Sequence, residues 1–552
     1  MTRDGPDGHD PGPGPRAGAG IGRAAALIAV LTIAARLLGL VRTLVFAKTV
    51  GATCLGTAYA TANLVPNVVY DVVLGGALTS VMVPILARPA RLAREDSAAA
   101  REVSQTSSAL LTWTVVVLVP VSVLVAVTAG PLSGLLIPRN LQGGCALHQH
   151  AVTTVSGQML AVFAPQILFY GLAVVLYGVL QAHRRFAGPA VAPLISSLVV
   201  ITAYLVFDPV GAAYTGHRIA RLPLTAELIL AIGTTAGVAA LVVVAVIPVW
   251  RLHIRMRPTL RFPAGVGRRA GGLAAYGIAA LLAQDAASLV VVVLANGRGA
   301  HGAYVLYGYA WQVFEACYAV LAISVAVSAF PVLSVHEGTE FDETAASSAR
   351  AVLLLSFLGT AALAAVAVPA AHVLVSYQRQ VPQLAAGFAL FAIGLAGYGL
   401  VACLSRVLLA AGRTGITATI VAGGWLLVIG VSITLVTLTP APWVVADLAL
   451  GTTVGLTAAG LALVAAVRRI RGSAALHGTL RAGVAGLAAA TAGAGAGAGA
   501  AAALPTGGVV AEGFIALLAA VCAVAAFGVV AWYLDPGDVR AALGRARRAV
   551  WR

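Results

Sequence analysis

The chain contains a long series of apolar segments, each close to the length that crosses a lipid bilayer. A spanning α-helix needs about 20 consecutive apolar residues. Only 10% of the residues are charged, against about 25% in a soluble domain. The sequence therefore predicts an all-α polytopic membrane protein with about 14 transmembrane helices. We expect them at 23–46, 57–86, 105–130, 152–181, 189–207, 224–249, 271–295, 302–333, 347–368, 383–411, 416–438, 442–466, 479–503 and 509–533.

Arginine clusters mark every second connection between these segments. They follow the second, fourth, sixth and twelfth segments and also end the chain, as in the stretch 251–269. This alternation is the positive-inside pattern, so we expect a multi-pass protein of a cell membrane with both termini in the cytoplasm. The net charge of +16 then faces anionic membrane lipids, and no nucleic-acid partner is expected.

The basic stretch 251–269 lies midway through the first twelve segments, where two six-helix halves would join. The predicted organisation is a disordered Gly/Pro-rich cytoplasmic tail, an N-terminal six-helix lobe, a C-terminal six-helix lobe, two additional helices and a basic cytoplasmic tail. The corresponding ranges are 1–22, 23–265, 266–470, 471–535 and 536–552.

Several charged residues interrupt the apolar segments. Arg36, Arg42 and Asp71 lie in the first two, and Asp285 and Glu315 lie in the seventh and eighth. A charge at the centre of a spanning helix costs roughly 2.5–3.5 kcal/mol on insertion scales, so such residues usually face a water-filled cavity or a partner. The carboxylates indicate cation or proton coupling. The alternative is that they pair with the arginines or form hydrogen bonds across helices.

The second segment also contains helix-breaking residues. Pro66 and Asn67 interrupt it early, and Gly75 and Gly76 follow. Proline removes a backbone donor and kinks a helix, and glycine lets helices approach closely. A packing kink and a gating hinge are both consistent with this pattern.

None of the five cysteines has the spacing of a zinc site, so no metal is expected. Cys54 and Cys145 both fall in connections assigned to the outside, where a disulfide can persist. Two free thiols are the alternative. The sequence contains no nucleophile-elbow, zinc-protease or phosphate-loop motif, so it predicts neither an enzyme nor a bound cofactor.

Several stretches together resemble the MurJ (MviN) family of lipid II flippases, in the MOP exporter superfamily. They include ARLLGLVR, NLVPNVVYDVVLGGALTSVMVPIL and FAPQILFYGLAVVLYGVLQAHRRFAGPAVAPLISSLVV. The resemblance implies two six-helix lobes around a central cavity, plus two C-terminal helices. It also implies transport of a polyprenyl-diphosphate-linked peptidoglycan precursor to the outer leaflet by alternating access. An H⁺ or Na⁺ gradient or the membrane potential would drive it, and cell-wall synthesis enzymes are candidate partners.

The resemblance makes Arg36 and Arg42 the expected diphosphate ligands, since guanidinium groups bind phosphate through charge-assisted hydrogen bonds. Tyr70, Asp71 and Gln312 stand where the family often has charged residues of its cavity. We expect Tyr70 and Gln312 to contact substrate, and Asp71, Asp285 and Glu315 to adjust the cavity charge or couple an ion.

Because these positions depart from the family pattern, another polyprenyl-linked glycan is an alternative substrate. Two other functions also fit the sequence. One is a scaffold for wall-synthesis enzymes that does not transport. The other is a cation-coupled antiporter of small molecules.

Overall fold

The computed structural model describes residues 15–72, 97–139, 141, 143–183, 185–252, 257–261, 266–375, 377–505 and 507–540. Every regular element in this part of the chain is helical, because in lipid each backbone N–H and C=O must find a partner within its own segment. Thirteen helices in it are long and apolar enough to span a membrane. The fold class predicted from the sequence is confirmed. The remaining predicted segment, 57–86, begins in α2 (Cys54–Val72), and its second part lies outside the described residues.

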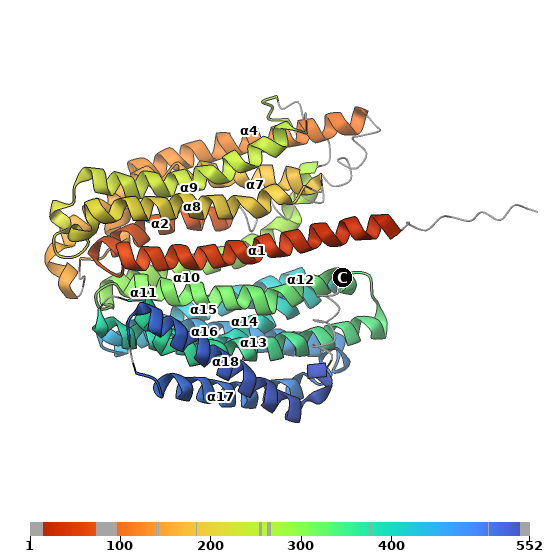
Figure 1. Ribbon diagram of the computed structural model, residues 1–552. Coiled ribbons are helices and arrows are strands. Elements are labelled where there is room, and N and C mark those ends of the chain that lie inside the picture. Colours follow the sequence, from red (N-terminus) through yellow and green to blue (C-terminus); the bar gives the residue numbers. More distant parts are fainter. Residues whose placement is uncertain are drawn as a thin grey trace, which may run out of the picture.

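The helices form two groups, which lie above and below α1 in Figure 1. We call the first group the N-lobe. It comprises α1 (Pro15–Thr49), α2, α4 (Ser97–Val127), α5 (Ala129–Leu136), α6 (Gln149–Phe163), α7 (Gln166–Ala182), α8 (Ala187–Gly211) and α9 (Leu224–Trp250).

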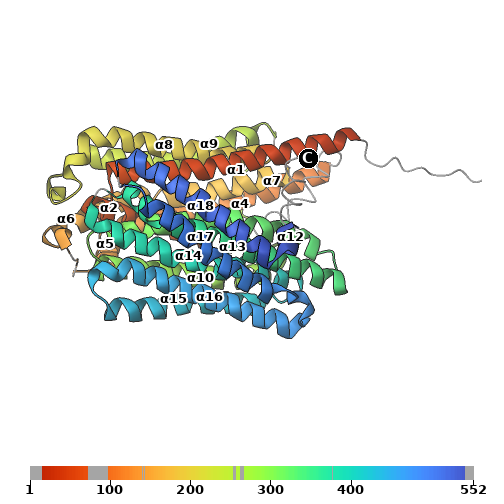
Figure 2. The same ribbon diagram turned by 60° about the horizontal axis from the view of Figure 1, so that its bottom comes forward.

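We call the second group the C-lobe. It comprises α10 (Val266–Arg298), α11 (Ala303–Tyr318), α12 (Ser324–Leu333), α13 (Gly338–Leu374), α14 (Val381–Ala410), α15 (Thr414–Leu438) and α16 (Val444–Arg471). The last two helices, α17 (Thr479–Ala502) and α18 (Val509–Leu534), pack against α13 (Figure 2).

Two predicted spans are each divided in the structure. The span expected at 152–181 is split into α6 and α7 at Ala164–Pro165, since proline cannot donate the next helical hydrogen bond. The Ser122 hydroxyl of α4 donates to the Ala164 carbonyl at this break (2.8 Å). The span expected at 302–333 contains a π-helical turn, Ala319–Ile323, between α11 and α12. Such turns leave one residue outside the regular register and are frequent at functional sites.

The disulfide between Cys54 and Cys145 joins two connections of the N-lobe. Cys54 begins α2, Cys145 lies in the 3₁₀ turn Gly143–His148, and their Cα atoms are 5.6 Å apart. We call this end of the molecule the disulfide end; it includes the connections after α1 and α10. The opposite end holds the start of α13, where Arg350 binds Asp538 (2.8 Å) and the His477 carbonyl (2.6 Å). These bonds fix α17, α18 and the segment after them to the C-lobe.

Glycines permit the closest helix contacts in the C-lobe. A Cβ atom on Gly424 of α15 would lie 2.6 Å from the Ala459 Cβ atom of α16, and 3.1 Å from the Gly455 carbonyl oxygen. Small residues are favoured at such interfaces because they let two helix backbones approach. The neighbouring Gly423 has no atom within 4 Å of the same position. Two adjacent glycines therefore differ in whether a side chain fits.

We expect Gly424→Val to destabilise the protein by about 1–3 kcal/mol, because the added methyl groups overpack the α15–α16 contact. Gly423→Val makes the same change on the open side of the same helix and is expected to have little effect. Thermal unfolding of both variants in one detergent, followed by tryptophan fluorescence, measures the difference. Equal unfolding midpoints would contradict the packing described here.

Candidate functional site

A cavity of about 340 Å³ lies between the two lobes. Helices α1, α2, α7, α8 and α9 line it from the N-lobe, and α11 lines it from the C-lobe. At 1.5 Å per residue, Arg42 lies about 10 Å along α1 from the disulfide end, and Gln312 lies about 14 Å along α11. The lining includes three residues that the sequence singled out, namely Arg42, Asn67 and Gln312.

Tyrosine hydroxyls surround Arg42 on the N-lobe wall. The Tyr59 hydroxyl lies 2.8 Å from the Tyr204 hydroxyl and 2.8 Å from the Thr234 hydroxyl. The charge of Arg42 acts on the phenol groups of Tyr59, Tyr170 and Tyr204. This wall therefore presents one guanidinium, a donor suited to an anionic oxygen-rich group, among hydroxyls that are hydrogen-bonded within the protein.

Gln312 connects the two lobes in this structure. The Thr43 hydroxyl of α1 donates to its Oε1 atom, and its Nε2 atom donates to the Gly39 carbonyl (3.4 Å). The side chain that was expected to contact substrate thus lines the cavity while it holds α1 against α11. A ligand would have to replace these bonds to use the Gln312 amide.

Helix α2 continues past the predicted break. Pro66 is buried, and the residues from Pro66 to Val72, where this described stretch stops, are helical. The Asn67 Oδ1 atom accepts a hydrogen bond from the Tyr170 hydroxyl (3.1 Å), and the Tyr70 ring lies 4.4 Å from the Tyr170 ring. The expected hinge is therefore packed against α7 in this state. Gly75 and Gly76, the other expected hinge residues, lie outside the described part of the chain.

A second group of charges lies further from the disulfide end, and we call it the charged layer. By helix rise, Arg36, Asp285 and Glu315 lie about 18–20 Å from that end, and Asp71 about 26 Å. Electrostatic interactions connect Arg36 with Glu315, Glu315 with Asp71, and Asp71 with Asp285. The structure describes all four residues, and no ion pair within 4.0 Å joins any two of them.

The four members of the charged layer differ in their surroundings. Arg36 and Glu315 are exposed, whereas Asp285 is only 4% exposed and its Oδ2 atom has no hydrogen-bond partner. Arg36 acts electrostatically on Glu315 of the C-lobe, and no ion pair within 4.0 Å joins Arg36 to Asp71. A buried carboxyl oxygen without a hydrogen-bond partner costs free energy in the charged form, so Asp285 is the member best suited to take up a proton or a cation.

Sequence reasoning missed the tyrosines and asparagine of the cavity wall, although the signal was present. Tyr59, Asn63 and Asn67 recur every fourth residue along α2 and all line the cavity. Residues four apart share one face of a helix. A polar stripe of this spacing inside an apolar segment indicates a face turned away from lipid.

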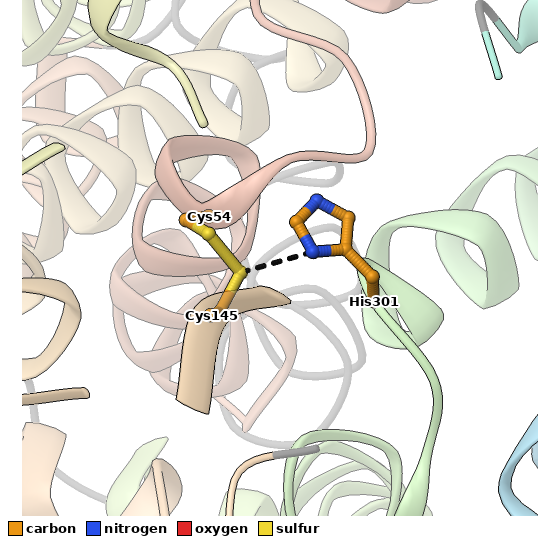
Figure 3. A group of neighbouring side chains, drawn as sticks. All are labelled: Cys54, Cys145 and His301. Carbon is orange, nitrogen blue, oxygen red and sulfur yellow. Dashed lines mark hydrogen bonds between the residues drawn. A yellow bond between two sulfur atoms is a disulfide. The ribbon is translucent and has the colours of Figure 1, made fainter. Parts of the chain in front are cut away.

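The disulfide lies next to a histidine from the other lobe (Figure 3). The Nδ1 atom of His301, in the connection between α10 and α11, is 3.2 Å from the Cys145 Sγ atom. Burial lowers the pKa of His301, so its imidazole is neutral at pH 7. The ligand atoms of Cys54, Cys145 and His301 lie within 4.8 Å of one another. However, cysteine binds a metal as the thiolate, and the sulfur atoms of Cys54 and Cys145 are joined in the disulfide.

We expect Tyr59→Phe to lower the stability of the protein by about 1 kcal/mol, since it removes a hydroxyl placed between two buried partners. Tyr533→Phe is the matched control, because Tyr533 is 80% exposed. Thermal unfolding of both variants tests the hydroxyl cluster. An unchanged midpoint for Tyr59→Phe would show that Tyr59 makes no effective hydrogen bond there.

Solved transporters share this arrangement of helices. The structure of a lipid II flippase MurJ in an inward closed conformation superimposes with a TM-score of 0.70, covering 92% of this chain and 99% of that one at 16% identity. An inward-facing multidrug resistance MATE family transporter of the MOP superfamily gives a TM-score of 0.60, covering 80% of this chain and 95% of that one at 14% identity. These likenesses show the fold.

Sequence relatives point to one family. A lipid II flippase MurJ of Burkholderia cenocepacia is 25% identical over 393 residues, which are 69% of this chain and 72% of that protein. Probable lipid II flippases MurJ of Synechocystis and Rickettsia prowazekii are 28% and 29% identical over 39% and 34% of this chain. The chain spans only 37% and 34% of the length of these two relatives. The family model described as lipid II flippase MurJ matches residues 46–517, and the chain therefore belongs to the MurJ family.

Proposed function

We propose that the protein moves a polyprenyl-diphosphate-linked cell-wall precursor, most directly lipid II, from the inner to the outer leaflet by alternating access. The observation that carries this proposal is the position of Arg42, a cation inside a cavity between two lobes. A charge at this depth has no structural ion-pair partner within 4.0 Å among the described residues. An anionic substrate would supply one.

The chemistry of the cavity wall suits a diphosphate. A guanidinium group donates two parallel hydrogen bonds to phosphate oxygens. The hydroxyls of Tyr59, Tyr170 and Tyr204 lie beside Arg42 and would donate to the substrate only by giving up their present partners. Arg36, in the charged layer, provides a second cation about 9 Å further along α1. A diphosphate moving along α1 would pass from one arginine to the other.

The contacts between the lobes support a direction of transport. Lobe–lobe hydrogen bonds join Asn296 to Thr61 and Leu136, and Gln380 to Ala52, all near the disulfide end. Arginines such as Arg468, Arg469 and Arg471 lie at the opposite end, which the positive-inside rule assigns to the cytoplasm. On this orientation the disulfide end is extracytoplasmic, and substrate enters from the inner leaflet.

The carboxylates of the charged layer are proposed to couple transport to an ion. Asp285 is buried on α10 of the C-lobe, and Asp71 lies on α2 of the N-lobe. Protonation or cation binding at Asp285 would change the repulsion between the two lobes. The coupling ion in this proposal is H⁺ or Na⁺, and contact with cell-wall synthesis enzymes stays a prediction.

We expect Arg42→Ala to lower lipid II transport at least about tenfold, since charge-assisted hydrogen bonds contribute about 1.5–3 kcal/mol each. Arg42→Lys keeps the charge but loses the bidentate geometry, so it should retain part of the activity. The measurement is exposure of lipid II on the outer leaflet in cells depleted of their own flippase, at matched protein levels. Arg36→Ala is expected to behave like Arg42→Ala.

Arg218→Ala is the control, because Arg218 is exposed in the connection between α8 and α9. Full transport by both Arg→Ala variants of α1 would remove the proposed diphosphate site. Absence of lipid II transport by the unmodified protein would instead favour the scaffold function. Drug resistance that follows an ion gradient and survives both substitutions would favour the antiporter.

We expect Asp285→Asn, which keeps the shape of the side chain but not its charge, to make transport insensitive to collapse of the coupling gradient. Asp208→Asn is the matched control, since Asp208 is exposed near the end of α8. Transport is compared with and without a protonophore or a sodium ionophore. If the Asp285→Asn variant keeps the ionophore response of the unmodified protein, Asp285 is not the coupling group.

A further inference from the structure

We propose that Gln380 of the C-lobe is a positioning residue that keeps the two lobes closed at the disulfide end, by docking onto an N-lobe segment that the Cys54–Cys145 bond holds in place. This inference rests on the proposed alternating access, because it concerns the contacts that must separate when the cavity opens at that end. The backbone carbonyls of Ala52 and His301 accept hydrogen bonds from the Gln380 side chain.

The Gln380 amide joins the two lobes through a single nitrogen. Gln380 ends the 3₁₀ turn Gln378–Gln380 before α14 and is 4% exposed. Its Nε2 atom donates to the Ala52 carbonyl of the N-lobe (2.9 Å) and to the His301 carbonyl of the C-lobe (3.1 Å). An amide nitrogen has two hydrogens, so both carbonyls are satisfied by one group. Without Gln380, a buried acceptor on Ala52 and a half-buried acceptor on His301 would lose this donor.

The N-lobe side of this contact is rigid for local reasons. The connection after α1 turns at Gly51, whose φ of +69° is readily adopted only by glycine. The Thr53 hydroxyl donates to the Val50 carbonyl and accepts from the Gly56 amide. Cys54 follows directly, fully buried and bonded to Cys145. The Ala52 carbonyl is thus held between a capped turn and a covalent link.

The C-lobe side closes directly onto this connection. Gly302 has a φ of +73°, and a Cβ atom there would lie only 2.4 Å from the Ala52 carbonyl oxygen. On the other side of the same connection, His301 reaches the Cys145 Sγ atom at 3.2 Å (Figure 3). Backbone contact at Gly302, the imidazole contact and the Gln380 amide therefore converge on residues 52–54 and Cys145.

Such a contact is suited to repeated opening. Each hydrogen bond contributes about 0.5–1.5 kcal/mol net, and water can replace the amide at the Ala52 carbonyl once the lobes part. An equilibrium between two conformations shifts by the free energy that differs between them, so losing the one interlobe bond, from Gln380 to Ala52, should shift the open-to-closed ratio about two- to tenfold. Reduction of the disulfide frees the Ala52 segment and should shift the ratio in the same direction.

The test is an interlobe distance measured without substrate. Spin labels are attached through keto amino acids at Arg218 of the N-lobe and Trp443 of the C-lobe, both exposed near the disulfide end, so that no cysteine is altered. Pulsed electron paramagnetic resonance then compares the unmodified chain with the Gln380→Glu variant. This substitution keeps the size of the side chain but replaces the amide NH2 donor by a carboxyl oxygen, which is an acceptor. We expect a second, longer distance with a population ratio raised about two- to tenfold.

Gln383→Glu is the matched control, since the Gln383 amide donates only to the Arg379 carbonyl of its own lobe (3.3 Å). Cys54→Ser with Cys145→Ser should also add the longer distance, whereas Cys522→Ser should not. Identical distances for Gln380→Glu and Gln383→Glu would overturn the proposal. So would a lowered unfolding midpoint for Gln380→Glu without a longer distance, because that result describes a purely structural residue.

The readout separates this inference from the proposed function. The distances are recorded in nanodiscs that contain no lipid II, so an added open population supports the Gln380 contact whatever the protein transports. Loss of transport in Arg42→Ala with unchanged distances supports the diphosphate site alone. A longer distance in Gln380→Glu, with no lipid II transport by the unmodified chain, would keep the contact and remove the proposed substrate.

Discussion

The cost of placing charge in a lipid-spanning bundle governs this structure. Arg42 lies in a cavity among phenol hydroxyls, and Arg36 lies within electrostatic reach of Glu315. Neither arginine can face lipid without a large penalty, so each must have polar surroundings from the protein or from water. The cavity between the lobes supplies them for Arg42, and the charged layer supplies them for Arg36.

The contacts within each lobe and between the lobes differ in kind. Within the C-lobe, helices meet through glycines such as Gly424, where no further atom fits. Between the lobes, the described hydrogen bonds are few and come from single side chains such as Gln312, Asn296 and Gln380. Close backbone packing resists change, whereas isolated polar contacts can exchange with water. This division fits two rigid bodies that move against each other.

Sequence reasoning recovered the membrane class and most of the spans, because length and hydropathy decide both. It treated the eighth segment, 302–333, as one regular helix, whereas the structure has a π-helical turn at Ala319–Ile323 between α11 and α12. It left open whether the carboxylates pair with the arginines, and the structure places Glu315 within electrostatic influence of Arg36 with no ion pair between them. Depth along a helix follows from residue count, but the direction in which a side chain points depends on how neighbouring helices are rotated.

The sequence by itself determined that this chain is a many-helix membrane protein with cations in its first helix, because apolar run length and residue identity are local properties. Only the tertiary structure decided that Gln312 binds α1, that Cys54 and Cys145 are bonded, and that Gln380 reaches Ala52 from another lobe. Each of these contacts joins segments separated by 91 residues or more. Their partners are set by the packing of whole helices, which no local pattern records.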